Sequence, residues 1–230
     1  MSKLLIAFEG SDGAGKATQT NMLVEHLKSL GLKIVRVSFP RYEDTVGGQL
    51  LFEAMKSERA EGYNFSKADP YEASLLYVMD RIASREYLAK LIEDHDVVVF
   101  DRYVESNLLH QGGKLKTEYE RRKFADWLYL LEYAQFHLPV PDVVVYLTIP
   151  FWLSRARAKR REDGGGPSMD AVEKDIEYVK AGHEGGLFYA KELGWQIINC
   201  LEEEVELTPE QVHNKITQTL QGRINALMIM

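Results

Sequence analysis

The residues from Phe8 to Thr18 could bind the phosphate groups of a nucleotide. Their sequence, FEGSDGAGKAT, places Gly10, Gly15 and Lys16 at the spacing of the pattern G-x-x-x-x-G-K-[ST]. Glycines let consecutive backbone N–H groups face phosphate oxygens, and the lysine brings a positive charge to the β- and γ-phosphates. The segment therefore predicts a P-loop. We expect it to bind ATP through Gly10, Ser11, Asp12, Gly13, Ala14, Gly15, Lys16, Ala17 and Thr18.

The loop departs from the pattern at one position, where Ala17 follows Lys16. A Ser or Thr there normally supplies a hydroxyl ligand for Mg²⁺. Thr18 comes next, but successive helical residues point roughly 100° apart, so its hydroxyl need not reach the same metal vertex. Either other groups and water hold the Mg²⁺, or metal binding is weaker.

Two further charged segments directly follow apolar runs. Asp101-Arg102-Tyr103 comes after the run Val97–Phe100, and Arg41 comes after another. The carboxyl edge of a parallel sheet is where ligands bind, and the planar guanidinium of arginine binds phosphate with two hydrogen bonds. These residues are therefore candidates for ligand contacts at that edge. The alternatives are a surface ion pair for Asp101 and Arg102 and a solvated Arg41.

Short apolar runs predict the buried strands of a parallel sheet. The runs are Lys3–Phe8, Lys33–Phe39, Val97–Phe100, Val143–Ile149 and, more weakly, Gln196–Cys200. Amphipathic stretches predict helices over Thr18–Leu30, Asp69–Ile92, Arg121–Phe136, Ser168–Leu193 and Pro209–Met228. Strands that alternate with helices form βαβ units. The sequence therefore predicts an α/β fold with a parallel sheet of about five strands flanked by helices.

The chain's length and composition indicate one globular domain, residues 1–230. Its one compositional break is RARAKRREDGGGP, Arg155–Pro167, which is basic and then glycine-rich. We interpret it as part of a mobile lid, about residues 153–168. The net charge of −7 argues against nucleic-acid binding. No apolar run approaches the roughly 20 residues that span a membrane. Because Cys200 is the only cysteine, we expect a reducing, cytoplasmic location.

Five segments, in order along nearly the whole chain, resemble the thymidylate kinase family. They are Phe39-Pro40-Arg41, LLYVMDR ending at Arg81, Asp101-Arg102-Tyr103 continued by Ser106, Gln111 and Gly112, LPVPDVVVYL, and Asp170-x-x-Glu173. The resemblance implies a P-loop NTPase-like fold with a lid, and transfer of the ATP γ-phosphate to dTMP, which yields dTDP for dTTP synthesis. It also implies Mg²⁺ as cofactor and a homodimer.

The resemblance further implies the roles of single residues. Asp12 would hydrogen-bond the acceptor sugar hydroxyl, Asp101 would help to bind Mg²⁺, and Arg102 would clamp the acceptor phosphate or the transferring phosphoryl group. Tyr77 would stack on thymine and Arg81 would bind its carbonyl oxygens, although the helical pattern alone favours core packing for Tyr77. The implied acceptor-binding residues are Arg41, Tyr77, Arg81, Arg102, Ser106, Asn107, His110 and Gln111.

Members of this family supply a catalytic arginine from either the P-loop or the lid. Here Gly13 stands at the P-loop position, whereas the lid carries Arg155, Arg157, Lys159, Arg160 and Arg161. The resemblance thus implies the lid type, with Arg157 or Arg160 acting on the phosphates; the alternative is a solvated basic helix end. The expected catalytic residues are Lys16, Asp12, Asp101, Arg102, Arg157 and Arg160. Asp170 and Glu173 would organise the lid or touch the acceptor, unless they form a solvated helical face.

Two alternative functions stay open from sequence. One is a kinase for another deoxynucleoside monophosphate or for a nucleoside. The other is a nucleotide-binding protein whose catalysis is weakened by Ala17.

Overall fold

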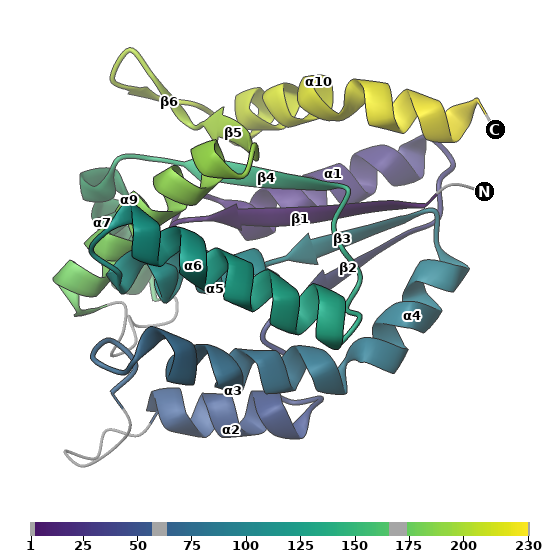
Figure 1. Cartoon of the computed structure of the whole chain (residues 1–230). Helices are drawn as coiled ribbons and strands as arrows, with labels where there is room; N and C mark the ends of the chain where they lie inside the picture. Colours follow the sequence, from purple (N-terminus) through teal and green to yellow (C-terminus); the bar gives the residue numbers. More distant parts are fainter. Residues whose placement is uncertain (1–2, 57–63, 166–173, 230) are drawn as a thin grey trace.

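A parallel sheet of five strands forms the centre of the chain (Figure 1). The computed structural model describes residues 3–56, 64–165 and 174–229. The strands follow the order β2-β3-β1-β4-β5, and each neighbouring pair is parallel. Their bounds are β1 Leu4–Gly10, β2 Ile34–Ser38, β3 Val97–Asp101, β4 Val143–Thr148 and β5 Gln196–Asn199. The predicted sheet is therefore confirmed.

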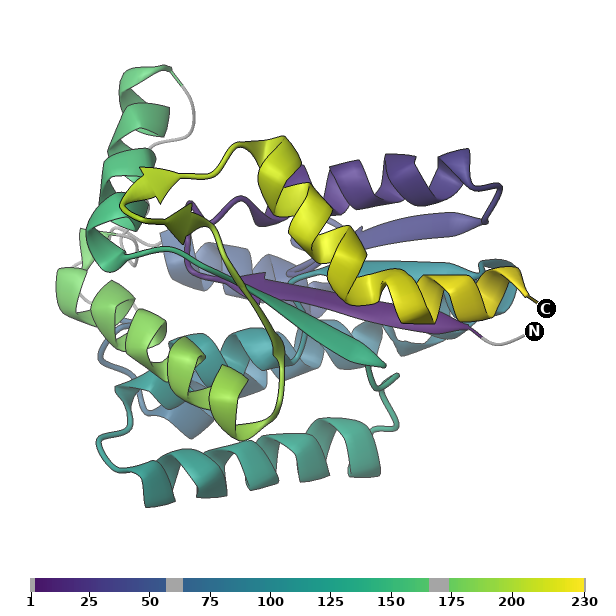
Figure 2. The ribbon, with the colours of Figure 1, turned by 90° about the horizontal axis from the view of Figure 1, so that it is seen from above.

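Helices cover both faces of this sheet (Figures 1 and 2). One face carries α1 and α10, and the other carries α3 to α6 together with α9. Helix α2 packs against α3, farther from the sheet. The helix bounds are α1 Lys16–Ser29, α2 Val46–Lys56, α3 Pro70–Ala83, α4 Arg85–Asp94, α5 Glu105–His110, α6 Glu118–Tyr129, α7 Phe151–Asp163, α9 Ile176–Glu192 and α10 Pro209–Met228.

Strand β1 is buried on both sides, which explains its continuous apolar run. Its side chains alternate between two hydrophobic clusters. Leu4, Ile6 and Phe8 pack toward α1 and α10, while Leu5 and Ala7 pack toward the other helical layer. This burial fixes where β1 ends, and hence where the loop that follows it lies.

Several helix predictions were wrong in detail. The helix expected over Asp69–Ile92 is two helices, because the chain turns at Ser84, whose N–H donates to both Asp80 O and Arg81 O. The helix expected to end at Phe136 continues from α6 into a π-helix, η2 Leu130–Gln135. Helix α9 matches the described part of its prediction.

Some short elements were missed altogether. The sequence pattern predicts neither α5 nor α2, whose first turn contains Gly47 and Gly48. These glycines are required by packing, since a Cβ on Gly47 would collide with the backbone of Asp80 and one on Gly48 with Arg41 O. Also missed were the 3₁₀ turn η1 Gly112–Lys114 and the antiparallel hairpin of β6 Leu201–Glu202 and β7 Val205–Glu206.

Among the described helices, none is both long and apolar enough to cross a membrane.

Candidate active site

The predicted phosphate loop joins the end of β1 to the start of α1. Gly13 and Gly15 have φ angles of 77° and 95°, a left-handed conformation that glycine adopts without strain. Lys16 lies under the loop, where its Nζ donates to Gly10 O at 2.8 Å and to Ser11 O at 3.0 Å. Burial and the nearby Arg102 lower the pKa of Lys16 to about 8. The strand, loop and helix thus have the arrangement of a P-loop, with the lysine at its centre.

Arg102 links this loop to the second predicted ligand site. It directly follows β3 with a φ of 66°, which turns its side chain back toward the loop. One Nη2–H donates to Asp12 Oδ1, and Nη1 lies 3.2 Å from His110 Nε2. Burial alone would raise the pKa of Asp12. The charges of Arg102 and Lys16 outweigh this effect and hold the pKa well below its usual range. Burial and Arg102 together lower the pKa of His110 to about 4. At neutral pH the site therefore holds a carboxylate, two cations and a neutral imidazole.

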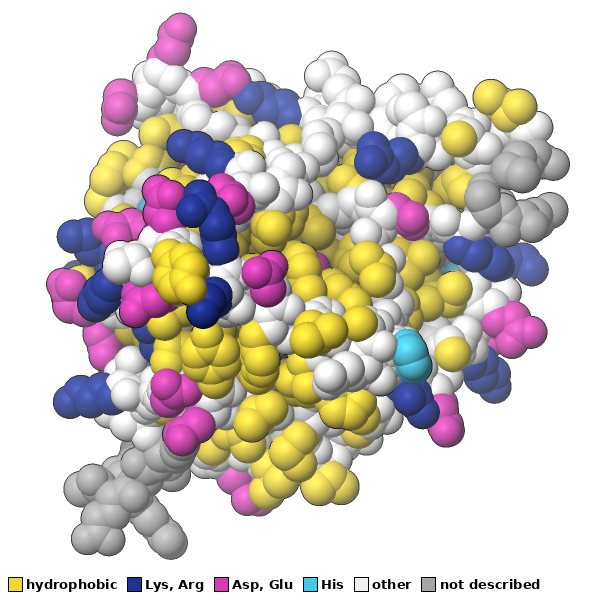
Figure 3. All heavy atoms as spheres, viewed as in Figure 1, with side chains coloured by type: hydrophobic (Ala, Val, Ile, Leu, Met, Phe, Trp, Pro, Cys, Tyr) yellow, Lys and Arg dark blue, Asp and Glu magenta, His cyan; other side chains and the backbone are white. Residues whose placement is uncertain are grey.

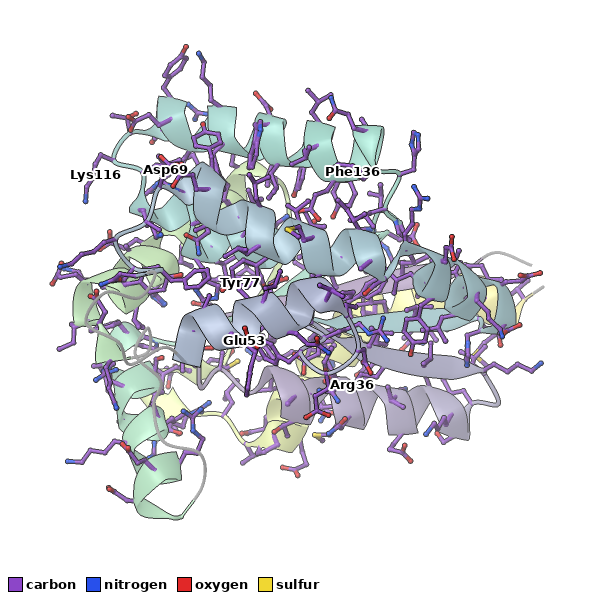
Figure 4. All side chains as sticks on the ribbon, turned by 90° about the horizontal axis from the view of Figure 1, so that it is seen from below. Arg36, Glu53, Asp69, Tyr77, Lys116 and Phe136 are labelled. Atoms are coloured by element: carbon purple, nitrogen blue, oxygen red, sulfur yellow. The ribbon has the colours of Figure 1, made fainter. Side chains whose placement is uncertain are left out.

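A cleft that is partly open to solvent lies beside this network. Seven of the predicted site residues line it: Ser11, Asp12, Tyr77, Arg81, Arg102, Ser106 and His110. Side chains that the sequence did not single out, such as Tyr42 and Tyr178, complete the wall. Figure 4 shows Tyr77 on α3, on the side where α2 packs. The fold thus brings the loop and most of the predicted acceptor residues to one cleft.

Arg81 is fully buried and is held by Glu132, which the sequence did not indicate. Its Nε and Nη2 donate to the two carboxylate oxygens of Glu132 at 2.5 and 2.7 Å. Its Nη1 contacts Tyr103 O at 3.4 Å. Burial opposes the charge of Arg81, but Glu132 outweighs it and raises the arginine pKa. The sequence does contain one indication of this ion pair: Glu132 is the single carboxylate in the apolar stretch LYLLEYAQF.

Glu9, at the end of β1, is a second buried carboxylate that the sequence reading missed. It is 0% exposed. Its oxygens accept hydrogen bonds from Tyr103 N at 2.8 Å and from Ser106 Oγ at 2.6 Å. Burial raises its pKa, against these hydrogen bonds and the charge of Arg102. Glu9 therefore fixes the backbone next to Arg102 and the start of α5.

Three of the predicted acceptor residues are not among the residues that line the cleft. Asn107 is buried, and its Nδ2 lies 3.5 Å from Ser74 O. Gln111 donates to the Tyr178 hydroxyl at 3.1 Å, so it supports a cleft residue from behind.

Arg41 is the third of these, and its side chain contacts residues at the start of α4. Its Nη1 donates to Ser84 Oγ at 3.0 Å, and its guanidinium lies 4.1 Å from the ring centre of Tyr87.

Asp101, the predicted Mg²⁺ ligand, forms an ion pair with Arg36 through one oxygen. Arg36, labelled in Figure 4, also donates to Thr20 Oγ1 at 2.9 Å. Thr18 and Ala17 are exposed at the start of α1. Within the described residues there is no cluster of three or more His, Cys, Asp or Glu that could hold a metal by itself. This donor set fits Mg²⁺, which commonly uses one or two carboxylates and takes its other ligands from phosphates and water.

Helix α7 begins the predicted lid, and it packs directly on the P-loop. Ser154 Oγ donates to Asp12 O at 2.5 Å, and Arg157 Nη1 donates to Gly13 O at 2.8 Å. A Cβ on Gly13 would lie 3.3 Å from both Arg157 Cβ and Ser154 O. The absence of a side chain at position 13 therefore makes room for the lid arginine. Arg160 lies one turn farther along and is mostly exposed.

Asp170 and Glu173, which were also assigned to the lid region, lie outside the described residues.

Comparisons with known proteins agree with this geometry. The family model "Thymidylate kinase" matches residues 8–216. Thymidylate kinase from Mycobacterium tuberculosis is 32% identical over 175 residues, 76% of this chain and 79% of that protein. Probable thymidylate kinase 1 from Saccharolobus solfataricus is 28% identical over 209 residues, 90% and 94% of the two chains. The solved structure of thymidylate kinase from Candida albicans has a TM-score of 0.71 at 20% identity and covers 97% of this chain and 93% of its own. That structure supports the P-loop NTPase-like fold.

Proposed function

The chain belongs to the thymidylate kinase family, and we propose that it uses the cleft to transfer the γ-phosphate of ATP to dTMP. The products are ADP and dTDP, which places the reaction in dTTP synthesis. One observation carries the proposal: Arg102 and Asp12 join the P-loop to a cleft that also contains Tyr77 and Arg81. A phosphate-donor site and a site for a planar base therefore lie on either side of one arginine.

Binding of the two anionic substrates requires positive charge at the point where they meet. The P-loop and Lys16 bind the phosphates of ATP, and Arg102 binds the acceptor phosphate or the moving phosphoryl group. Phosphoryl transfer depends mainly on positioning and on charge stabilisation, so these cations supply most of what the reaction needs. Arg157 or Arg160 adds a further cation from the lid, which also excludes water.

Recognition of the acceptor uses the other wall of the cleft. Tyr77 stacks on the thymine base, and Arg81 hydrogen-bonds its carbonyl oxygens. Glu132 holds two nitrogens of Arg81, so the guanidinium has one orientation. Asp12, a carboxylate at neutral pH, accepts a hydrogen bond from the sugar hydroxyl. Ser106 and His110 line the same space, with Asn107 and Gln111 packed behind them. Arg41, whose Nη1 donates to Ser84 Oγ, would contact the acceptor phosphate.

Asp101, together with phosphate oxygens and water, would hold the Mg²⁺ that the reaction uses. When bound, this ion neutralises charge on the β- and γ-phosphates. The Arg36 ion pair leaves the second carboxylate oxygen of Asp101 available for a water or the ion. Ala17 removes one ligand but leaves the phosphate-binding backbone unchanged.

We also propose that the protein is a single domain with a lid and that it works as a cytoplasmic homodimer. Figure 3 shows hydrophobic side chains gathered over the helical layer that contains α3 and α6. On α3, Leu75 and Met79 are 45% and 46% exposed, four residues apart on one side of the helix, and Leu130 on η2 is 56% exposed. Sedimentation of the protein and of Met79→Glu would test the dimer. A monomeric wild-type protein would contradict it.

The substrate is tested by ADP release with dTMP, dUMP, UMP and thymidine as acceptors. We expect the highest kcat/KM with dTMP, and a preference over dUMP of about 10- to 200-fold, because a single methyl group discriminates by about 1–3 kcal/mol. Phosphorylation of thymidine but not dTMP would indicate a nucleoside kinase. ATP binding without product at any Mg²⁺ concentration would indicate a binding protein.

A further inference from the structure

One carboxylate in the β6–β7 hairpin contacts both candidate lid arginines. Arg157 donates to Glu206 Oε2 from Nη2 at 3.1 Å and from Nε at 3.3 Å. Arg160 donates to Glu206 Oε1 from Nη2 at 3.0 Å. The two oxygens of Glu206 therefore serve two guanidinium groups. Figure 2 shows the hairpin beside α7.

The contacts of Arg157 leave part of its guanidinium available. Nη1 donates to Gly13 O at 2.8 Å, while Nε and Nη2 face Glu206. An arginine has five N–H donors. With one N–H in each of these three contacts, two donors stay available among the described residues. Glu206 and Gly13 O thus hold the guanidinium beside the P-loop and leave two N–H donors for phosphate oxygens.

The base of the hairpin that carries Glu206 is anchored to the end of β4 and lies next to the P-loop. Cys200, at its base, donates its N–H to Thr148 O at 3.0 Å, and its Sγ lies 3.9 Å from Ala14 O. On the other side Glu202 forms an ion pair with Lys215 of α10. The position of Glu206 is therefore set by β4 and α10 as well as by the lid arginines.

The turn of the hairpin shows that its shape is closely determined. Glu203 and Glu204 form a two-residue loop with φ angles of 46° and 62°. Two positive φ angles suit the twist of a tight hairpin, but glycine or asparagine adopts them at much lower cost than glutamate. Backbone strain of this kind persists where the surroundings enforce it and often marks a functional segment.

The positive charges of Arg157 and Arg160 explain why a carboxylate, that of Glu206, lies between them. Arg157 and Arg160 are three residues apart on one helical face, where like charges repel. Glu206 offsets this repulsion. Partial burial opposes its ionisation, but hydrogen bonds from Arg160 and Arg157 outweigh it and hold the pKa of Glu206 below its usual range. The ion pairs are therefore present at neutral pH.

We propose that Glu206 is a positioning residue for phosphoryl transfer, because it orients Arg157 against the P-loop and draws Arg160 alongside. The hairpin is then a working part of the lid, although it lies far from the lid in sequence. The inference rests on the proposed role of Arg157, through which Glu206 acts. Arg160 is the weaker of the two, since its side chain is 62% exposed and it contacts Glu206 through a single hydrogen bond.

The test compares Glu206→Gln with Glu204→Gln in the full chain. Both substitutions remove one negative charge from the same hairpin, but only Glu206 contacts the arginines. We expect Glu206→Gln to lower kcat about tenfold, with the KM for dTMP unchanged and Tm within a few degrees of wild type. Glu204→Gln should keep the wild-type kcat. In the background of Arg157→Ala, Glu206→Gln should cause little further loss, because its partner is gone.

Each other outcome has a defined meaning. If kcat were unchanged in Glu206→Gln but lowered in Arg157→Ala, the proposed role of Glu206 would be rejected and that of Arg157 would stand. An unchanged kcat in Arg157→Ala would reject the proposed role of that arginine, and Glu206 with it. Equal losses in the two hairpin variants would show a general charge effect, and fully additive losses with Arg157→Ala would show that Glu206 acts elsewhere. Either result would overturn the proposal.

Discussion

Glu132 in the π-helix η2 binds Arg81 of α3 through both carboxylate oxygens, at 2.5 and 2.7 Å from Nε and Nη2. Both side chains are almost completely buried. The pair therefore joins a helix remote from the P-loop to the wall of the cleft. It also links stability to acceptor recognition, because the residue it holds is the one expected to read the base.

Substitution of Glu132 by Gln should destabilise the protein and impair acceptor binding. A buried charge left without its partner costs about 3–5 kcal/mol when the pair is broken, and the amide recovers part of this as a hydrogen-bond acceptor. We expect a loss of about 2–4 kcal/mol in the free energy of unfolding, measured with urea, and a higher KM for dTMP with little change in that for ATP. Glu86→Gln, on the exposed surface of α4, is the control. A variant as stable as wild type would mean that Arg81 is hydrated.

Gly13→Ala should push α7 a few tenths of an ångström away from the P-loop. The new Cβ would lie 3.3 Å from Arg157 Cβ and Ser154 O, and φ is 77°. We expect kcat/KM for ATP to fall about tenfold or more, because both loop and lid must shift. Gly31→Ala is a matched control, since its φ is 85° and nothing lies within 4 Å of its added Cβ. If both variants lost activity equally, backbone strain and not the lid contact would be the cause.

Ala17→Ser should restore the expected hydroxyl without disturbing the loop. Ala17 is exposed at the start of α1, so the added oxygen meets no steric barrier. We expect the Mg²⁺ concentration for half-maximal rate to fall or stay the same, with kcat within about twofold of wild type. Ala17→Cys, which is similar in size but a poor Mg²⁺ ligand, is the control. A large loss of rate in the serine variant would show that the loop differs from other P-loops at this position.

The sheet and the P-loop were predictable because their signals are local. Buried parallel strands are continuous apolar runs, and the phosphate loop has its glycines and lysine in a fixed pattern. By contrast, α2 was missed because Gly47 and Gly48 resemble a turn. Both positions must be glycine because α3 and the Arg41 carbonyl pack too closely for a side chain, and that approach is a tertiary property.

Site residues could be predicted from the sequence where they belong to a motif at the end of a strand. Residues whose role is to hold another side chain in place could not be predicted. Asp12 and Arg102 carry motif signals, and the fold brings them into contact. Glu9, Glu132 and Glu206 have no motif, because each acts by holding a partner far away in sequence. Arg41 was expected at the cleft, but its backbone position does not decide where its long side chain points. Only the fold provides this information.

A last buried carboxylate gives the protein a pH-dependent stability. Glu105, on α5, is 2% exposed, and its Oε1 accepts a hydrogen bond from the Tyr133 hydroxyl at 2.6 Å. Burial raises its pKa from 4.5 to about 7; the hydrogen bond from Tyr133 opposes this shift, and the charge of Glu9 adds to it. Because the folded state binds the proton more tightly than the unfolded state, this group stabilises the fold fully below pH 4.5, and the contribution is lost as pH rises through about 7.

Glu105→Gln should therefore remove this pH dependence. The amide stays neutral, and its oxygen can still accept from Tyr133. By linkage, the variant should match wild type near pH 5 and exceed it by about 2–3 kcal/mol near pH 8, since each pKa unit corresponds to about 1.4 kcal/mol. Urea denaturation at the two pH values, with Glu86→Gln as control, measures the difference. If Glu105→Gln gained nothing at the higher pH, Glu105 would ionise in the folded protein as it does in the unfolded chain, and water would have to reach it.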